Sequence, residues 1–122
     1  MSNNRDRIVR EYLSHHSLTD TFIYRSTIRV NGSYPDFRFK IVWTGSFYEM
    51  DIVSLPDYNG RPTCATVNHW LPSSRGGRKI CIATGHEPQD GAQAIKIAME
   101  WSDLQAEYIR SGTTPDQQLN RR

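Results

Sequence analysis

Cys81 is the side chain in this sequence whose surroundings best suit covalent chemistry. It closes the segment Arg75-Gly76-Gly77-Arg78-Lys79-Ile80-Cys81, in which basic residues frame a glycine turn. A cysteine attacks as its thiolate, and neighbouring cations stabilise that form. The pattern therefore predicts a nucleophilic thiol at Cys81. The alternative is structural: Ile80-Cys81-Ile82 is then a buried strand in which the thiol is a small apolar side chain.

Two polar residues upstream are candidates to assist such a thiol. His69, in the segment Asn68-His69-Trp70, can act as a base or can hold a loop in place through its ring nitrogens. Asn68 can donate a hydrogen bond to an oxyanion, and it can equally occupy a turn. The sequence makes both residues site candidates and leaves the choice between catalytic and structural roles open.

Cys64, His69, Cys81 and His86 support a rival prediction, a zinc site. Four residues separate Cys64 from His69, and four separate Cys81 from His86. Two cysteines and two histidines on neighbouring segments can bind zinc tetrahedrally. However, strand residues five apart point to opposite faces unless the chain bends, so this spacing favours a site without metal. We therefore expect no cofactor and keep zinc as the alternative.

The elements that must position these residues follow from hydrophobic periodicity. Apolar residues recur at helical spacing over residues 4–16, and again after Asp90, a residue type typical of an N-cap. Between the two helices, the pattern predicts strands over residues 21–30, 37–43, 47–55, 63–68 and 79–84, the last two being short. This order predicts an α+β domain, a four-stranded antiparallel meander flanked by an N-terminal and a C-terminal helix.

Length and composition limit the domain organisation and the setting. A chain of 122 residues is long enough for one core, so we assign residues 1–110 to a single domain and residues 111–122 to a disordered tail. The polar start and the lack of a long apolar run predict a cytoplasmic protein without a membrane partner. The two cysteines are expected to be free thiols. A net charge of +2 argues against a nucleic-acid partner.

The middle of the chain resembles ubiquitin-conjugating enzymes. In that family an aromatic and acidic strand leads to a proline, then a tyrosine, then a proline four residues later; here these are Pro56, Tyr58 and Pro62. A histidine and an isoleucine-cysteine-aliphatic segment follow in the family, and His69 and Ile80-Cys81-Ile82 match them. The resemblance covers residues 5–110 and implies the ubiquitin-conjugating fold.

One departure from the family pattern concerns the oxyanion. The family's His-Pro-Asn triplet reads His69-Trp70-Leu71 here, so its asparagine has no counterpart at that spacing. The sequence is similar in this respect to minimal bacterial relatives, some of them encoded with antiphage defence systems of the CBASS type. The resemblance then implies a protein partner with a flexible C-terminal tail, either a CD-NTase or a ubiquitin-like protein, together with an activating enzyme.

The chemistry implied by this resemblance is acyl transfer. Cys81 would attack the activated C-terminal carbonyl of the partner's tail and form a thioester, with backbone amides or Asn68 stabilising the oxyanion. The tail is expected to bind along the basic turn, at Arg75, Gly76, Gly77, Arg78 and Lys79. A second class of function stays open, a protein-binding module of the same fold with an inert cysteine.

Overall fold

The computed structural model describes residues 4–15 and 21–120 of the chain. Its helices are α1 (Asn4–His15), α2 (Ala65–Asn68), α3 (Gly91–Ser111) and α4 (Pro115–Leu119). Its strands are β1 (Thr21–Arg25), β2 (Asp36–Trp43), β3 (Tyr48–Ser54), β4 (Trp70–Pro72) and β5 (Arg78–Ile80). The helix predicted over residues 4–16 is confirmed as far as residue 15, and residue 16 lies outside the described residues.

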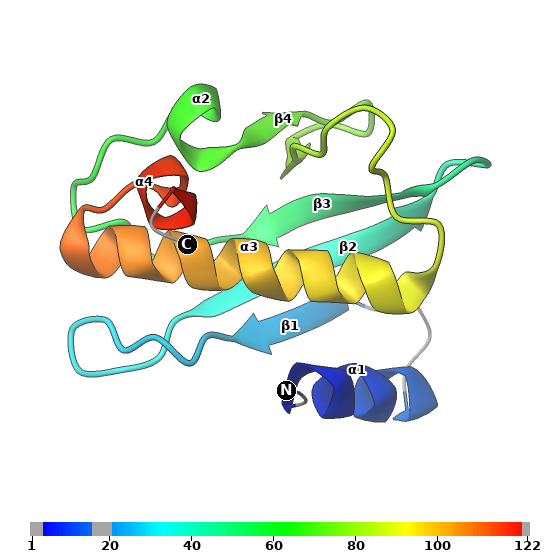
Figure 1. Cartoon of the computed structure of the whole chain (residues 1–122), viewed down its shortest axis with the longest axis horizontal. Helices are drawn as coiled ribbons and strands as arrows, with labels where there is room; N and C mark the ends of the chain where they lie inside the picture. The colour runs from blue at the N-terminus through cyan, green and yellow to red at the C-terminus, as the bar shows by residue number, and fades with distance from the viewer. Residues whose placement is uncertain (1–3, 16–20, 121–122) are drawn as a thin grey trace.

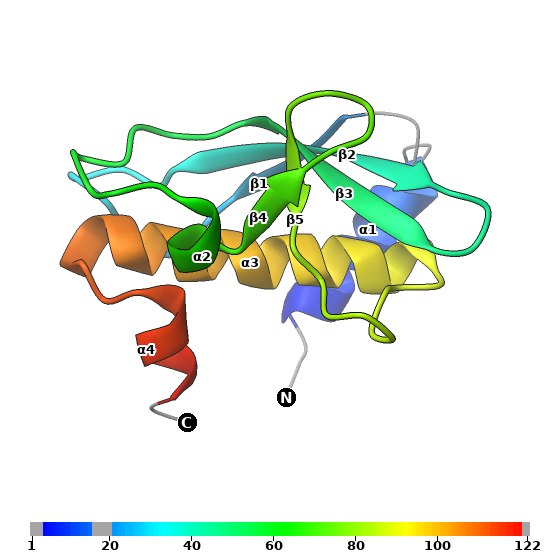
Figure 2. The ribbon, with the colours of Figure 1, turned by 90° about the horizontal axis from the view of Figure 1, so that it is seen from above.

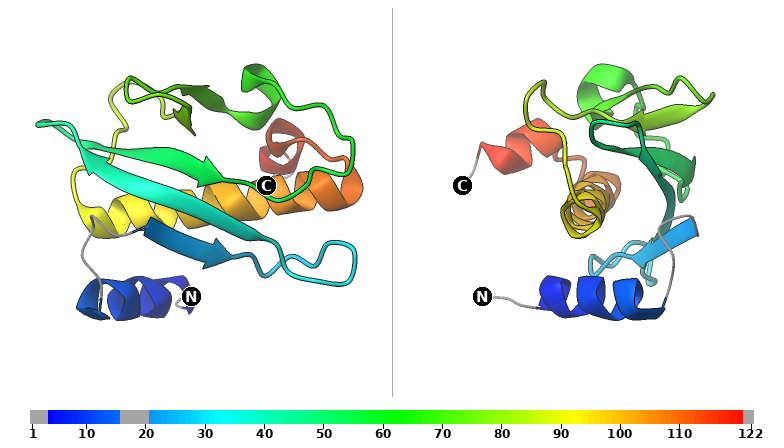
Figure 3. Two further views of the ribbon diagram at one scale, coloured as in Figure 1. Left: turned by 180° about the vertical axis from the view of Figure 1, so that it is seen from behind. Right: turned by 90° about the vertical axis from the view of Figure 1, so that its right-hand side faces the viewer.

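The strands form one antiparallel sheet, and α3 crosses one of its faces. The order of strands is β1-β2-β3-β5-β4. α1 lies near the β1 edge of the sheet and α2 lies near the β4 edge (Figure 1). Seen from above, the sheet and α3 make two layers, and α4 lies on the side of α3 that faces away from the sheet (Figures 2 and 3). None of the helices in residues 4–15 and 21–120 covers the opposite face of the sheet (Figure 3).

The α+β class is confirmed, but the prediction of a four-stranded meander is wrong. The sheet has five strands, because the segment after β3 returns as a β4–β5 hairpin and places β5 beside β3. β4 and β5 contain three residues each, which is too short for a period of two to be recognised. The prediction of a strand over residues 79–84 is wrong beyond Ile80, where β5 ends.

The strand predicted over residues 63–68 is also wrong, since Ala65–Asn68 forms α2. Thr66 and Val67 are β-branched and favour a strand by propensity. A side-chain hydrogen bond decides otherwise: Asn68 Oδ1 accepts from the backbone N–H of Cys64 at 3.0 Å and closes the turn. Here a local contact overrides propensity.

The disordered tail predicted for residues 111–122 contains a helix, α4, so the prediction is wrong for residues 115–119; residues 121–122 lie outside the described residues. α4 begins with a capping box. Thr114 Oγ1 accepts from the N–H of Gln117 at 3.2 Å, and Gln117 Oε1 accepts from the N–H of Thr114 at 2.9 Å. Pro115 occupies the first turn, where its missing N–H costs nothing.

The core lies between α3 and the sheet. Trp101 of α3 packs edge-to-face on Phe37 and Phe39 of β2, with ring centroids 6.2 and 5.9 Å apart. Such aromatic pairs stabilise the interface beyond the area they bury. The predicted N-cap is confirmed, since Asp90 Oδ1 accepts from the N–H of Gln93 at 2.7 Å. None of the helices described here is long and apolar enough to span a membrane.

Candidate functional site

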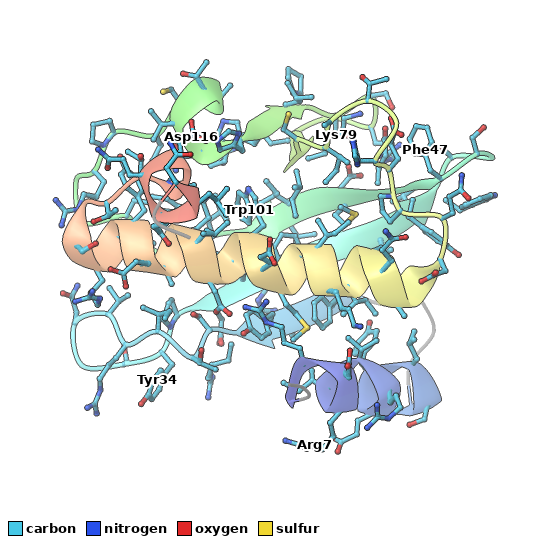
Figure 4. All side chains as sticks on the ribbon, viewed as in Figure 1. Arg7, Tyr34, Phe47, Lys79, Trp101 and Asp116 are labelled. Atoms are coloured by element: carbon cyan, nitrogen blue, oxygen red, sulfur yellow. The ribbon has the colours of Figure 1, made fainter. Side chains whose placement is uncertain are left out.

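An open groove between the β4–β5 hairpin and α3 contains Cys81. Its cavity volume is about 230 Å³. Most of its walls are apolar, with Ile97 and Leu104 contributed by α3 and Leu119 by α4. Figure 4 labels Trp101 of α3, which lines the groove, and Asp116 of α4. The groove is therefore a concave, largely apolar surface next to a thiol.

The hairpin places Cys81 opposite His69. In the β4–β5 register Trp70 pairs with Ile80, and the next step of that register joins His69 to Cys81. The two backbones are in contact there, since the N–H of Cys81 donates to the carbonyl of His69 at 2.9 Å. Both residues line the groove. The structure thus brings together the predicted nucleophile and the predicted histidine.

His69 connects the groove to two helices. It ends α2 with a left-handed backbone, φ 58° and ψ 53°, which turns the chain into β4. This conformation costs a residue with a Cβ roughly 1 kcal/mol. Its ring is 39% exposed, and Nε2 lies 2.8 Å from Oδ1 of Asp116 on α4. The backbone of His69 thus holds Cys81, and its ring is bonded to α4.

Asn68, the predicted oxyanion donor, is a buried structural residue. It is 0% exposed, and its Nδ2 donates to Gln105 Oε1 at 2.8 Å while its Oδ1 accepts from Cys64 N. Its carbonyl accepts from both Trp101 Nε1 and Gln105 Nε2 at 3.0 Å. Tyr58 donates to the same Gln105 Oε1 at 2.7 Å. Because this network occupies the Asn68 amide inside the core, the side chain does not face the groove.

Two of the predicted thiolate-stabilising cations are bonded elsewhere. Arg75 donates to Asp51 Oδ2 and to Glu49 Oε1, both at 2.6 Å, and Lys79 donates to Glu49 Oε2 at 2.6 Å. Glu49 and Asp51 project from the face of the sheet opposite α3, since Met50 between them is in the core; Lys79 does the same on β5, next to the core residue Ile80. Burial raises the pKa of both carboxyl groups, but hydrogen bonds from the cations outweigh burial and lower it. These cations stabilise the sheet instead of the Cys81 thiolate.

The remaining residues of the basic turn have structural partners too. The Arg78 guanidinium lies 4.1 Å from the ring centroid of Trp70, a cation–π contact. Gly76 and Gly77 have φ of 95° and 69°, values that glycine adopts without strain. The N–H of Ser73 donates to the Gly77 carbonyl at 3.0 Å and closes the loop. The two glycines are thus explained by the hairpin turn itself.

Cys64 differs from Cys81 in nearly every respect. It is exposed and lies at the N-cap of α2, outside the residues that line the groove. Its Sγ lies 3.6 Å from Thr66 Oγ1. That side-chain contact, followed by the backbone amide of Val67, lowers the pKa of the Cys64 thiol. The local structure therefore favours ionisation at Cys64, which does not line the Cys81 groove.

The four zinc candidates do not form a ligand cluster. Over residues 4–15 and 21–120, no group of three or more His, Cys, Asp or Glu side chains is placed to hold a metal ion. Cys64 contacts Thr66 and His69 contacts Asp116 in place of a shared centre. The geometry gives no support to the zinc alternative.

Asp116 is the site residue that sequence reasoning missed. It lies in the segment predicted as a disordered tail, so no role was assigned to it. The signal was present in the spacing of Thr114 and Gln117, since a threonine followed three residues later by glutamine is typical of a capping box. A helix beginning at Pro115 would have placed an acidic residue in its first turn.

Comparisons with protein-family models, with curated proteins and with solved structures found no match to this chain.

Proposed function

We propose that this chain is a cysteine-dependent acyltransferase of the ubiquitin-conjugating type, with Cys81 forming a thioester with the C-terminal tail of a partner protein. The observation that carries the proposal is the placement of Cys81 and His69 in one open groove. A structural cysteine needs neither a groove nor a polar neighbour. The resemblance of Pro56, Tyr58, Pro62 and the cysteine segment to that family supports the same function.

The acylation step is a displacement at a carbonyl carbon. Cys81 Sγ attacks the activated carboxyl of the tail, the new C–S bond forms, and the bond to the adenylate or thiol leaving group breaks. The leaving group takes the electron pair, and the proton of the Cys81 thiol passes to solvent. The activated donor supplies the free energy, so no other co-reactant is needed.

The groove provides the binding surface for the tail. Its apolar walls fit an apolar side chain next to the acylated carboxyl, held between α3 and α4. The basic turn was the expected binding surface, but Arg75 and Lys79 are bonded to acidic residues of the sheet. We therefore place the tail along Cys81, Ile82 and Leu119. The partner class is a protein with a flexible C-terminus, such as a CD-NTase or a ubiquitin-like protein.

The test uses a synthetic peptide thioester with an apolar penultimate residue and a 2-mercaptoethanesulfonate leaving group. We expect intact-mass analysis to find one acyl adduct on the unsubstituted protein and on Cys64→Ser, released by added thiol. Cys81→Ser should give no thiol-labile adduct. Equal labelling of Cys64→Ser and Cys81→Ser would show that the groove does not select Cys81. An adduct on Cys64 alone would leave Cys81 as an inert thiol in a protein-binding module.

A further inference from the structure

We propose that His69 is the general base for transfer of the acyl group from Cys81 to an acceptor amine, and that Asp116 of α4 is its positioning residue. This inference rests on the proposed function and adds the second half of the reaction. It also gives α4 a role: the short helix completes the site. Three observations carry it, namely the backbone of His69, the bond between its ring and Asp116, and the anchoring of α4.

The backbone at position 69 is one that glycine adopts without the cost that a Cβ brings. His69 adopts φ 58° at the end of α2, where its carbonyl accepts from Cys81. The turn needs only the backbone for that contact. The turn therefore does not require the imidazole, and His69 is one of the residues that line the Cys81 groove. Residues with a strained backbone conformation cluster at functional sites, where they place a reactive side chain.

The bond to Asp116 fixes which ring nitrogen can take a proton. A carboxylate only accepts hydrogen bonds, so the nitrogen 2.8 Å from Asp116 Oδ1, Nε2, carries the hydrogen. Nδ1 then keeps its lone pair in the neutral ring. A carboxylate that holds an imidazole in one tautomer and one orientation is the arrangement that activates histidine bases in many enzymes.

α4 is anchored well enough to hold Asp116 in place. Gln118 Nε2 donates to the carbonyl of Leu104 on α3 at 3.0 Å and to the carbonyl of Thr113 at 2.9 Å. Pro115 is buried, and the capping box of Thr114 fixes the first turn that carries Asp116. Gln118 thus ties α4 to α3 after Asp116, and the capping box fixes the turn that contains Asp116.

The transfer step balances as follows. The acceptor amine attacks the thioester carbonyl, and its nitrogen loses a proton to Nδ1 of His69. The C–S bond breaks, Cys81 leaves as a thiolate with the electron pair, and an amide bond replaces the thioester. The imidazolium returns its proton to the thiolate or to solvent. Asn68 is buried and cannot stabilise the oxyanion. The groove therefore assists the transfer through a base, His69.

The test separates loading from discharge. Cys81 is loaded with the peptide thioester, excess donor is removed, and loss of the adduct in added lysine is followed by intact mass. We expect His69→Gly to load normally and to discharge about 10²-fold more slowly, with added imidazole restoring the rate. Glycine suits φ 58°, so this variant keeps the turn. Asp116→Ala should slow discharge less, and Asp116→Asn, which keeps an acceptor, should recover part of the rate.

The matched control is Asp36→Asn, an acidic residue paired with Arg25 on the sheet and remote from the groove, which should discharge at the unsubstituted rate. Discharge of His69→Gly at that rate, or a slow rate that imidazole does not restore, would overturn the inference and leave the thioester function standing. Failure of the unsubstituted protein to load Cys81 would overturn the proposed function and the inference together.

Discussion

The two cysteines of this protein differ in their exposure, in their contacts and in the surface beside them. Cys64 has a lowered pKa from its Thr66 contact but lies exposed at the start of a short helix. Cys81 lines an apolar groove with His69, and the nearby cations Arg75 and Lys79 are ion-paired with Glu49. The cysteine with the lowered pKa is thus not one of the residues that line the groove. Our proposal for Cys81 therefore rests on the groove and on His69.

The largest effect is expected at the residue that joins the two regions. Asn68→Ala removes the acceptor of the Cys64 backbone N–H and one of the two donors to Gln105 Oε1, the other being the Tyr58 hydroxyl. Buried polar groups without partners cost a few kcal/mol, so we expect the free energy of unfolding to fall by about 3 kcal/mol. Urea denaturation measures this loss. Asn120→Ala, at the exposed end of α4, is the control and should leave the midpoint unchanged.

A smaller effect is expected when the basic turn is broken. Arg75→Ala removes the hydrogen bonds to Glu49 and Asp51, which we expect to cost about 1 kcal/mol at neutral pH. If the cations do not activate Cys81, the rate of acylation of Cys81 should stay the same. A large loss of acylation in this variant, at unchanged fold, would contradict the division between the two regions.

The pH dependence of this ion-pair cluster has a definite sign. The folded-state pKa values of Glu49 and Asp51 are lowered from 4.5 and 3.8, because hydrogen bonds from the cations outweigh burial. Their contribution is therefore present above the pKa values of the unfolded chain and is lost as the pH falls below about 4.5 through the folded values. Melting temperatures measured between neutral and acid pH should fall less steeply for Arg75→Ala. An unchanged slope would show that these pairs do not stabilise the fold.

The Cys64 region can be tested with a small alkylating reagent. Thr66→Val keeps the shape of the side chain and removes the hydroxyl, so the pKa of the Cys64 thiol should rise and its alkylation by iodoacetamide at neutral pH should slow by a few-fold. Alkylation of Cys81, mapped on the same samples, is the internal control. If both cysteines slow together, the substitution has altered the fold and not the pKa of Cys64.

The smallest effect is expected for Cys64→Ser. The side chain is exposed, so the melting temperature should not change measurably. Thioester formation at Cys81 should persist as well. A lower melting temperature, or loss of thioester formation at Cys81, would show that Cys64 has a structural role despite its exposure.

The sequence predicted the elements that have a clear period and missed those fixed by local contacts. Residues 37–43 alternate as a strand, and α3 follows its Asp90 cap, so both were found. α2 depends on the Asn68 contact with Cys64, which no periodicity reveals. Cys81 and His69 were both named from the sequence, but the pairing of His69 with Asp116 required the position of α4.

The most direct test of the account is a competition between the two cysteines in the unsubstituted protein. The peptide thioester with an apolar residue and iodoacetamide are each reacted to less than one label per molecule, and peptide mapping gives the ratio of Cys81 to Cys64. We predict that the peptide labels Cys81 in preference and that iodoacetamide shifts the ratio towards Cys64. The same ratio with both reagents, or a preference of the peptide for Cys64, would contradict the claim that the groove makes Cys81 the acyl acceptor.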